Sequence, residues 1–303
     1  RSMYDPADMD LRAGVPDMEL QRRVQDRRTN QFCGGQQKAA QHSHAAYDAK
    51  PAGEPETEAE IRQFQAEYYG MISNIDWNVG RVLNHLDALG IAENTMVIFW
   101  SDHGDMLGQH GSYCGIKNQA YRASMQVPFI VRYPKRFAGG RKTEAMVDVG
   151  VDLMATLCEL TGMELPDDVH SESYLPVLDG DDKAGRGAIW YQLFRQNDGN
   201  PGEYTPFAQR GIRTKDWLYV RNKDVRVDLY DLNADYLEQR NLVDDPAYAA
   251  LMQSFDGMIA DHMAKTGDDW EMAASFPPPD WITHVEAKKL LETELLPRAV
   301  VVP

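Results

Sequence analysis

The 303-residue sequence contains few cysteines and no long apolar run. Its three cysteines, Cys33, Cys114 and Cys158, are an odd number and lie far apart, so they provide neither a disulfide framework nor the CxxC spacing of a zinc site. The cysteines therefore do not determine the compartment. No run approaches the roughly 18 apolar residues of a membrane-spanning helix, so we expect no membrane span. The opening "RSMYDPADMD" lacks a signal-peptide core and a starting Met, and we expect that a further segment precedes it.

A surplus of basic residues is also absent. The chain has 31 Lys and Arg against 47 Asp and Glu, a formal net charge of −16. Nucleic acids and anionic membranes attract basic surfaces, so this balance argues against either as a partner. If the ligand is an anion, local cations or a metal must attract it. With 43% hydrophobic residues, the chain is long enough to form one large domain, alone or with a smaller second one.

Hydrophobic periodicity predicts the elements of an α/β sheet after a polar loop that extends to about residue 57. Apolar residues recur at three- and four-residue steps from Ile61 to Leu89, which predicts a long helix, and Gly90 follows as its terminal glycine. The apolar runs "TMVIFW" and "VPFIVRYP" predict two buried strands with helices on both faces. The segment "VDVGVDLMATLCELTG" then predicts a helix that ends at Gly162. This alternation of helices and buried strands is typical of an α/β fold.

The pattern changes near residue 206. The segments "FAQRGIRTKDWLYVRN" and "VRVDLYDLN" alternate apolar and polar residues, which predicts strands with one solvated face. The segment "PAYAALMQSFDGMIADHMAK" predicts an amphipathic helix. We therefore expect an α/β domain over residues 1–205, and a C-terminal subdomain with a wrapping, proline-rich tail over residues 206–303. The subdomain is expected to contain a small antiparallel sheet plus a helix.

The segment "SDHGDMLGQHG" contains candidate site residues, because Asp102 and His103 follow directly after the first apolar run. In open α/β sheets, ligands bind beyond the carboxyl ends of the strands. A carboxylate beside an imidazole can bind a divalent metal, and the glycines would let the backbone pass close to a bound group. The alternative is a capping Asp and a surface His in a glycine-rich turn.

The longer segment "VIFWSDHGDMLGQHGSYCGIKNQAYRASMQVPFIVRYP" resembles the sulfatases of the alkaline phosphatase superfamily. Those sequences have a strand, SDHGD-LG-HG, a lysine and a second strand that begins with VP. Later segments are similar in the same order, namely "VDLMATLCELTGMELP", "SYLPVLDG" and "GIRTKDWLYV…DLYDLNADYLEQRNL". The resemblance implies an alkaline-phosphatase-like sheet covered by helices on both faces, sulfuric ester hydrolase activity and a periplasmic or secreted location.

The resemblance also implies roles for individual residues. Asp102 and His103 match two protein ligands of a single divalent cation, with Ca²⁺ favoured over Mg²⁺, which would polarise the sulfate oxygens. Lys117 matches the lysine that contacts the sulfate, and the alternative is a solvated loop lysine. His110 matches the histidine of the LG-HG segment, which either shapes the pocket or packs structurally. Arg122 stands where the family usually has Glu.

The family's nucleophile is missing from the chain. Sulfatases attack with a formylglycine made from C/S-x-P-x-R, and none of "CGGQQ", "CGIKN" and "CELTG" matches it. The resemblance therefore implies that formylglycine and the remaining metal ligands lie in a missing N-terminal part, and that this chain alone is inactive.

Three functions remain open. The first is a sulfatase that acts on a sulfated small molecule or saccharide, with carbohydrate sulfate favoured. The second is a phosphomonoester, phosphodiester or phosphonate hydrolase of the same superfamily, because the metal and the lysine suit either tetrahedral oxyanion. The third is a non-catalytic sulfatase-like fragment.

Overall fold

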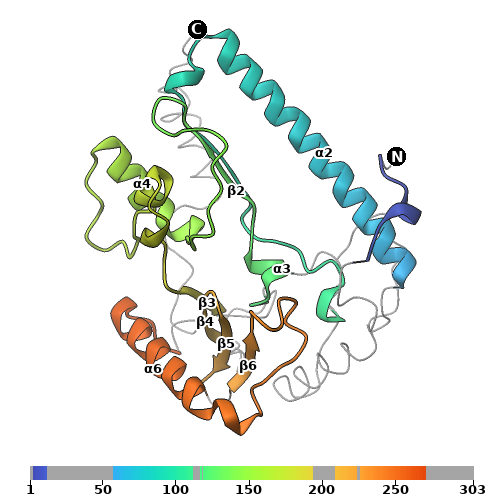
Figure 1. The fold of residues 1–303 in the computed structure, drawn as a ribbon, viewed down its shortest axis with the longest axis vertical. Helices are drawn as coiled ribbons and strands as arrows, with labels where there is room; N and C mark the ends of the chain where they lie inside the picture. Colours follow the sequence, from blue (N-terminus) through green and yellow to red (C-terminus); the bar gives the residue numbers. More distant parts are fainter. Residues whose placement is uncertain are drawn as a thin grey trace, which may run out of the picture.

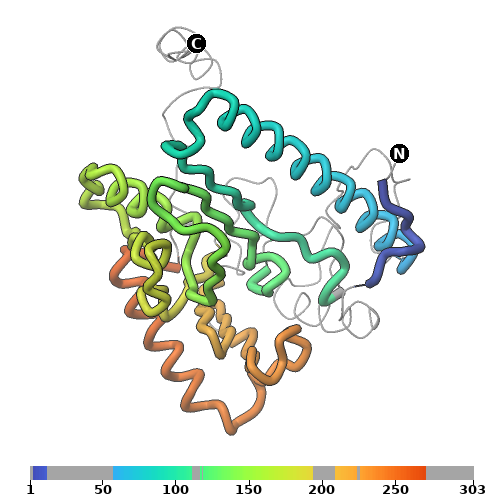
Figure 2. The backbone as a smooth tube through the Cα atoms, turned by 45° about the horizontal axis from the view of Figure 1, so that its top comes forward, coloured from blue at the N-terminus to red at the C-terminus, as the bar shows by residue number. Residues whose placement is uncertain are grey.

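The computed structural model describes residues 3–11, 57–111, 117, 119–193, 209–223 and 226–270. The loop expected before residue 57 and the proline-rich tail lie outside the described residues, apart from the loop's first few positions. In both Figure 1 and Figure 2, a long helix, α2 (Glu58–Ala88), runs along one side of the molecule. The C-terminal sheet with helix α6 (Ala249–Thr266) lies on the opposite side. None of the described helices has the length and apolar composition needed to cross a membrane.

Helix α2 covers Glu58–Ala88, as predicted. Its first turn is closed by a capping box, in which the Thr57 side chain accepts from the Glu60 backbone N–H and the Glu60 carboxylate accepts from that of Thr57. The chain leaves the helix through Gly90, whose φ of 69° is the left-handed conformation that favours glycine. Helix formation here follows from local signals.

The two apolar runs form strands β1 (Val97–Trp100) and β2 (Phe129–Arg132), which pair antiparallel. The expectation that helices cover both faces is not met within the described residues, because Trp100 is 40% exposed and Ile130 is 62% exposed. The reason is that the described sheet has two strands rather than the several that would bury both faces. One side of β1 and the facing side of α2 instead line a groove that is apolar except for Asn78. Its lining residues are Ile75, Asn78, Val79, Val82, Leu83, Val97, Ile98 and Phe99.

Two shorter helices flank β2 in sequence. Helix α3 (Arg122–Met125) precedes β2, and helix α4 (Val149–Thr161) ends at Gly162 as predicted. In the first turn of α4, Asp152 is buried and accepts hydrogen bonds from the Arg186 guanidinium and from the backbone N–H of Glu172. These contacts fix α4 to the chain that leads to helix α5 (Leu175–Asp179).

The predicted C-terminal antiparallel sheet plus helix is confirmed. Its strands are β3 (Ile189–Leu193), β4 (Gln209–Arg213), β5 (Trp217–Asn222) and β6 (Arg226–Asp231), paired in that order, and α6 covers Ala249–Thr266. Strand β3 pairs with β4 although it precedes residue 206, so the sheet extends across the division expected between residues 205 and 206. The division into two domains stays a prediction.

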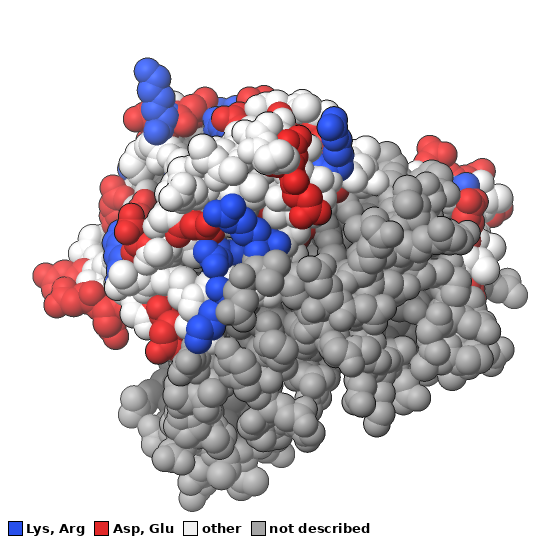
Figure 3. All heavy atoms as spheres, turned by 90° about the horizontal axis from the view of Figure 1, so that it is seen from below, with Lys and Arg blue, Asp and Glu red and all other residues white. Residues whose placement is uncertain are grey.

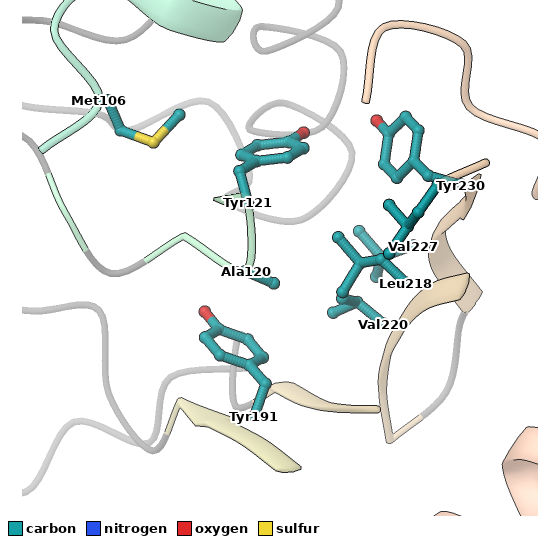
Figure 4. Close-up of a cluster of buried hydrophobic side chains, with 9 residues drawn as sticks. Met106, Ala120, Tyr121, Tyr191, Leu218, Val220, Val227 and Tyr230 are labelled. Atoms are coloured by element: carbon teal, nitrogen blue, oxygen red, sulfur yellow. The ribbon is translucent and has the colours of Figure 1, made fainter. Parts of the chain in front are cut away.

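Both faces of this sheet are buried, so the expectation of one solvated face is wrong. On one face, residues of the sheet pack against α6, including Tyr219 against Phe255. On the other face, Leu218 and Val220 pack with residues of the segment that follows the SDHGD motif, and Met106, Ala120 and Tyr121 meet the sheet there (Figure 4). The C-terminal sheet is thereby joined to the candidate site segment by an apolar core.

Candidate active site

Asp102 and His103 lie directly after β1, where the sequence predicts them. The Ser101 hydroxyl donates to the backbone carbonyl of His103 at 2.8 Å. The backbone N–H of His103 donates to Oδ1 of Asp102 at 2.9 Å, so the Asp102 side chain closes the turn that it begins. Asp102 therefore has the capping role that was the alternative to a metal-binding role, and this contact occupies one of its two carboxylate oxygens.

The other carboxylate oxygen faces the neighbouring imidazole. Oδ2 of Asp102 lies 3.1 Å from Nε2 of His103, and the two side chains are 80% and 39% exposed. The hydrogen bond from the His103 backbone N–H holds the pKa of the Asp102 carboxyl below its usual value, so the group is ionised at neutral pH. A carboxylate oxygen and an imidazole nitrogen thus lie side by side and accessible, and these are donor types that bind divalent metals.

The pair by itself is only part of a metal site. Ca²⁺ takes about six to eight ligands, mostly oxygens. Among the described residues, no group of three or more His, Cys, Asp or Glu side chains is placed to hold a metal ion. The two side chains therefore fit a divalent cation as an incomplete set of ligands.

The glycines of the turn allow close packing of protein against protein. The Gly104 N–H donates to the carbonyl of Ser124 in α3 at 2.7 Å, and a Cβ on Gly104 would lie 1.9 Å from the carbonyl oxygen of Ala123. Gly108 has a φ of 84°, and a Cβ there would lie 2.9 Å from Cδ1 of Ile61 in α2. The segment is thus held between α3 and α2, a different use from the close approach to a bound group that we expected.

His110 and Lys117 are placed differently from each other. The His110 backbone is left-handed, with a φ of 56°, and its ring stacks on the buried Tyr121 at a centroid distance of 3.8 Å. Lys117 is exposed, and Cys114 lies outside the described residues. On the face drawn in Figure 3, a small group of Lys and Arg side chains lies among dispersed Asp and Glu. The sulfate-binding role of Lys117 and the pocket role of His110 stay predictions.

Glu238 is a buried residue of this region that sequence reasoning missed. It is 2% exposed and lies in the loop after β6, yet its carboxylate reaches α3, where Oε2 accepts from the Arg122 backbone N–H at 2.9 Å. Its Oε1 accepts from Nη1 of Arg213 in β4 at 2.7 Å. Burial raises the pKa of Glu238, and the charge of Arg213 opposes that rise. The Arg122 guanidinium packs over the ring of Tyr236, 3.6 Å from its centroid.

Comparison with known families gives two overlapping matches. The sequence profile of the sulfatase family matches residues 36–163. A second profile, described as N-sulphoglucosamine sulphohydrolase, C-terminal, matches residues 108–265. The two profiles overlap across the segment that contains His110 and Lys117.

Individual relatives agree with these profiles. The chain is 31% identical over 193 residues to the N-acetylglucosamine-6-O-sulfatase of Bacteroides thetaiotaomicron, a match that covers 62% of this chain and 33% of that protein. The chain spans less than half the length of the curated relatives it matches first.

Solved structures show the same fold. The structure of BT4656 in complex with its substrate D-glucosamine-2-N,6-O-disulfate is 28% identical, with a TM-score of 0.60 over 72% of this chain and 44% of that chain. The phosphonate monoester hydrolase of Agrobacterium radiobacter is 24% identical, with a TM-score of 0.71 over 87% of this chain and 53% of that chain. The described architecture is therefore that of an alkaline-phosphatase-like fold.

Proposed function

Because the chain belongs to the sulfatase family of the alkaline phosphatase superfamily, we propose that it supplies one part of the active site of a sulfatase that hydrolyses sulfated carbohydrates. The observation that carries the proposal is the accessible contact between Asp102 and His103 at the end of β1. A relative that is named for sulfated N-acetylglucosamine and a similar structure bound to a disulfated glucosamine support a saccharide as the substrate.

In this proposal, Asp102 and His103 are two of the ligands of one divalent cation. A carboxylate oxygen suits either of the hard cations Ca²⁺ and Mg²⁺, and the resemblance to sulfatases favours Ca²⁺. The bound cation supplies Lewis-acid polarisation of the sulfate oxygens. Lys117 places a compact positive charge against the same sulfate group. His110, whose ring is held by Tyr121, forms part of the pocket wall.

The nucleophile and the remaining metal ligands belong to a part of the enzyme outside this chain. The 303 residues contain no C/S-x-P-x-R sequence from which a formylglycine is made. We therefore propose that the chain provides electrostatic stabilisation, and that the chain without that other part does not turn over a sulfate ester.

The proposal is tested in the full-length protein by Asp102→Ala and Lys117→Ala. Removal of a charged ligand is expected to weaken Ca²⁺ binding and to lower kcat/KM for a sulfated N-acetylglucosamine by at least about 100-fold. Lys117→Ala is expected to retain Ca²⁺ while turnover falls, because that side chain contacts substrate rather than metal. Isothermal titration with Ca²⁺ and an assay of released sulfate measure the two effects.

Asp179→Asn is the control, because Asp179 is an acid paired with Arg136 outside the proposed site. Wild-type Ca²⁺ affinity and turnover in Asp102→Ala would contradict the metal assignment. Parallel assays with phosphate monoesters, phosphate diesters and phosphonates distinguish the alternative, since the same cation and lysine suit those oxyanions. Higher kcat/KM for one of them would replace the sulfatase assignment.

A further inference from the structure

Glu238 connects the C-terminal subdomain to the segment that holds Asp102 and His103. We propose that Glu238 is a positioning residue for this pair and that it acts through α3. The inference rests on the proposed function of the pair as metal ligands. It extends that function to a residue more than 130 positions away in sequence, in a loop of the other subdomain.

The first support is that the side chain of Glu238 does not bond within its own loop, although its backbone N–H donates to the carbonyl of Asp235. Other polar side chains of the loop after β6 bond within it: Asp231 accepts from the backbone N–H groups of Asn233 and Ala234, and Asp235 accepts from that of Arg240. Glu238 has its acceptor contacts elsewhere, on β4 and on α3. Those backbone contacts shape the loop, whereas the Glu238 carboxylate accepts both of its hydrogen bonds from outside it.

The second support is the conformation of Glu238. Its φ of 58° lies in the left-handed region, which is unfavourable for a residue with a Cβ. Residues remain in such conformations when the surrounding contacts determine them, and these outliers cluster at functional sites. Here the contacts are the two hydrogen bonds of a carboxylate that is almost fully buried.

The third support is the continuous path from Glu238 to the pair. Its carboxylate binds the backbone N–H of Arg122, the first residue of α3. Two residues later in α3, the carbonyl of Ser124 accepts from Gly104 at 2.7 Å. Gly104 follows His103 directly and its carbonyl accepts from Nδ1 of that residue at 2.8 Å. Because Gly104 packs too closely on Ala123 for even a methyl group, a shift of α3 has to move the turn.

The apolar core beside this path cannot replace it. Tyr121, which precedes Arg122, packs edge-on against Tyr230 of the C-terminal sheet (Figure 4), with 5.9 Å between the ring centroids. Such contacts hold the two parts together without specifying direction. The hydrogen bonds of Glu238 are directional, so they fix where α3 begins.

The test compares Glu238→Ala, Glu238→Gln and wild type in the full-length protein. Hydrogen exchange of the Gly104 amide is expected to be about tenfold faster in Glu238→Ala, and the Kd for added CaCl2 is expected to rise about tenfold, as for other residues that orient metal ligands. Glu238→Gln keeps a carbonyl oxygen that can accept from Arg122. Its Gly104 exchange rate and its Kd for CaCl2 should therefore lie between those of wild type and Glu238→Ala. If Glu238→Ala does not fold, Glu238→Gln against wild type gives the same two readouts.

Asp256→Asn is the matched control. Asp256 is an acid on α6 that binds two arginines, Arg221 and Arg226, within the same subdomain but away from α3. The Asp256→Asn substitution should lower the melting temperature but should not speed hydrogen exchange of the Gly104 amide.

Equal Gly104 exchange in Glu238→Ala and Asp256→Asn would overturn the inference, because Glu238 would then only stabilise its subdomain. Unchanged Ca²⁺ affinity in Glu238→Ala would also overturn it, provided that Asp102→Ala does weaken Ca²⁺. If Gly104 exchange rises while Asp102→Ala leaves Ca²⁺ affinity unchanged, the positioning role stands and the proposed metal function fails.

Discussion

At the scale of single residues, the turn after β1 is fixed by how closely its backbone approaches α3. Gly104→Ala would place a methyl group 1.9 Å from the carbonyl oxygen of Ala123, and rigid backbone cannot move aside cheaply. Overpacking of this kind costs roughly 1–3 kcal/mol. We expect a loss of this size in the free energy of unfolding, measured by urea denaturation, together with weaker Ca²⁺ binding in the full-length protein.

Gly139→Ala is the matched control for this prediction. A Cβ on Gly139 would meet nothing within 4 Å, so the same substitution adds the same methyl group without a clash. If Gly104→Ala were as stable as Gly139→Ala, the close approach between the turn and α3 would be refuted.

The Asp102–His103 pair and Glu238 differ in how far their contacts can be predicted from the sequence. The position of Asp102 and His103 just after β1 was predictable because it depends on the apolar run beside them, and the contact between them joins neighbours in sequence. Their role as metal ligands stays a prediction. Glu238 was not predictable from spacing, since its partners lie 116 and 25 positions away. Its signal in the sequence is its place in "DLYDLNADYLEQRNL", which shows a resemblance but no contact.

At the scale of elements, α6 and β3 meet through two stacked rings, of which the histidine titrates. The ring of His262 in α6 lies 4.0 Å from that of Trp190 in β3 at an interplanar angle of 8°. Burial lowers the pKa of His262 below its ordinary value of 6.5, although the charge of Asp268 opposes the shift. The folded state therefore holds the proton less tightly than the unfolded state does.

The sign of this shift predicts a loss of stability in acid. The stabilising contribution of neutral His262 is fully present above pH 6.5 and declines as the pH falls through the lower folded pKa. His262→Phe keeps an aromatic ring against Trp190 but cannot titrate. Urea denaturation at pH 7.5 and pH 5 should therefore show a smaller loss of stability for His262→Phe than for wild type. An equal loss in both proteins would show that His262 does not contribute to the acid sensitivity.

Element boundaries were predicted better than element surroundings. The ends of α2 follow from a capping box and a glycine, which act within a few residues. The covering of a strand depends on distant chain: continuous apolar sequence in β1 and β2 suggested burial, yet the described structure leaves Ile130 62% exposed. The alternating strands of the C-terminal sheet are buried on both faces, because α6 covers one face and the segment after the SDHGD motif covers the other. Arg210, which is buried in this sheet, is neutralised by Asp268.

At the scale of the whole molecule, apolar surface remains open between α2 and β1. Two side chains of this groove, Ile75 and Val82, are 50% and 56% exposed. Water-exposed apolar patches of this kind favour association. The chain also spans less than half the length of the relatives it matches first. In those relatives, the remaining part of the protein is large enough to cover a surface of this kind. We propose that the groove is covered when the rest of the sulfatase fold is present.

The 303-residue chain on its own should therefore self-associate through this groove and should not hydrolyse a sulfate ester when Ca²⁺ is added. Val82→Glu places a charge in the groove, whereas Asn84→Glu places the same charge on an exposed position of α2 outside it. Light scattering after gel filtration, with binding of an apolar dye, should show less association for Val82→Glu and no change for Asn84→Glu. A monomeric chain that cleaves a sulfated sugar with Ca²⁺ would contradict the proposal, because the nucleophile would then have to lie within these residues.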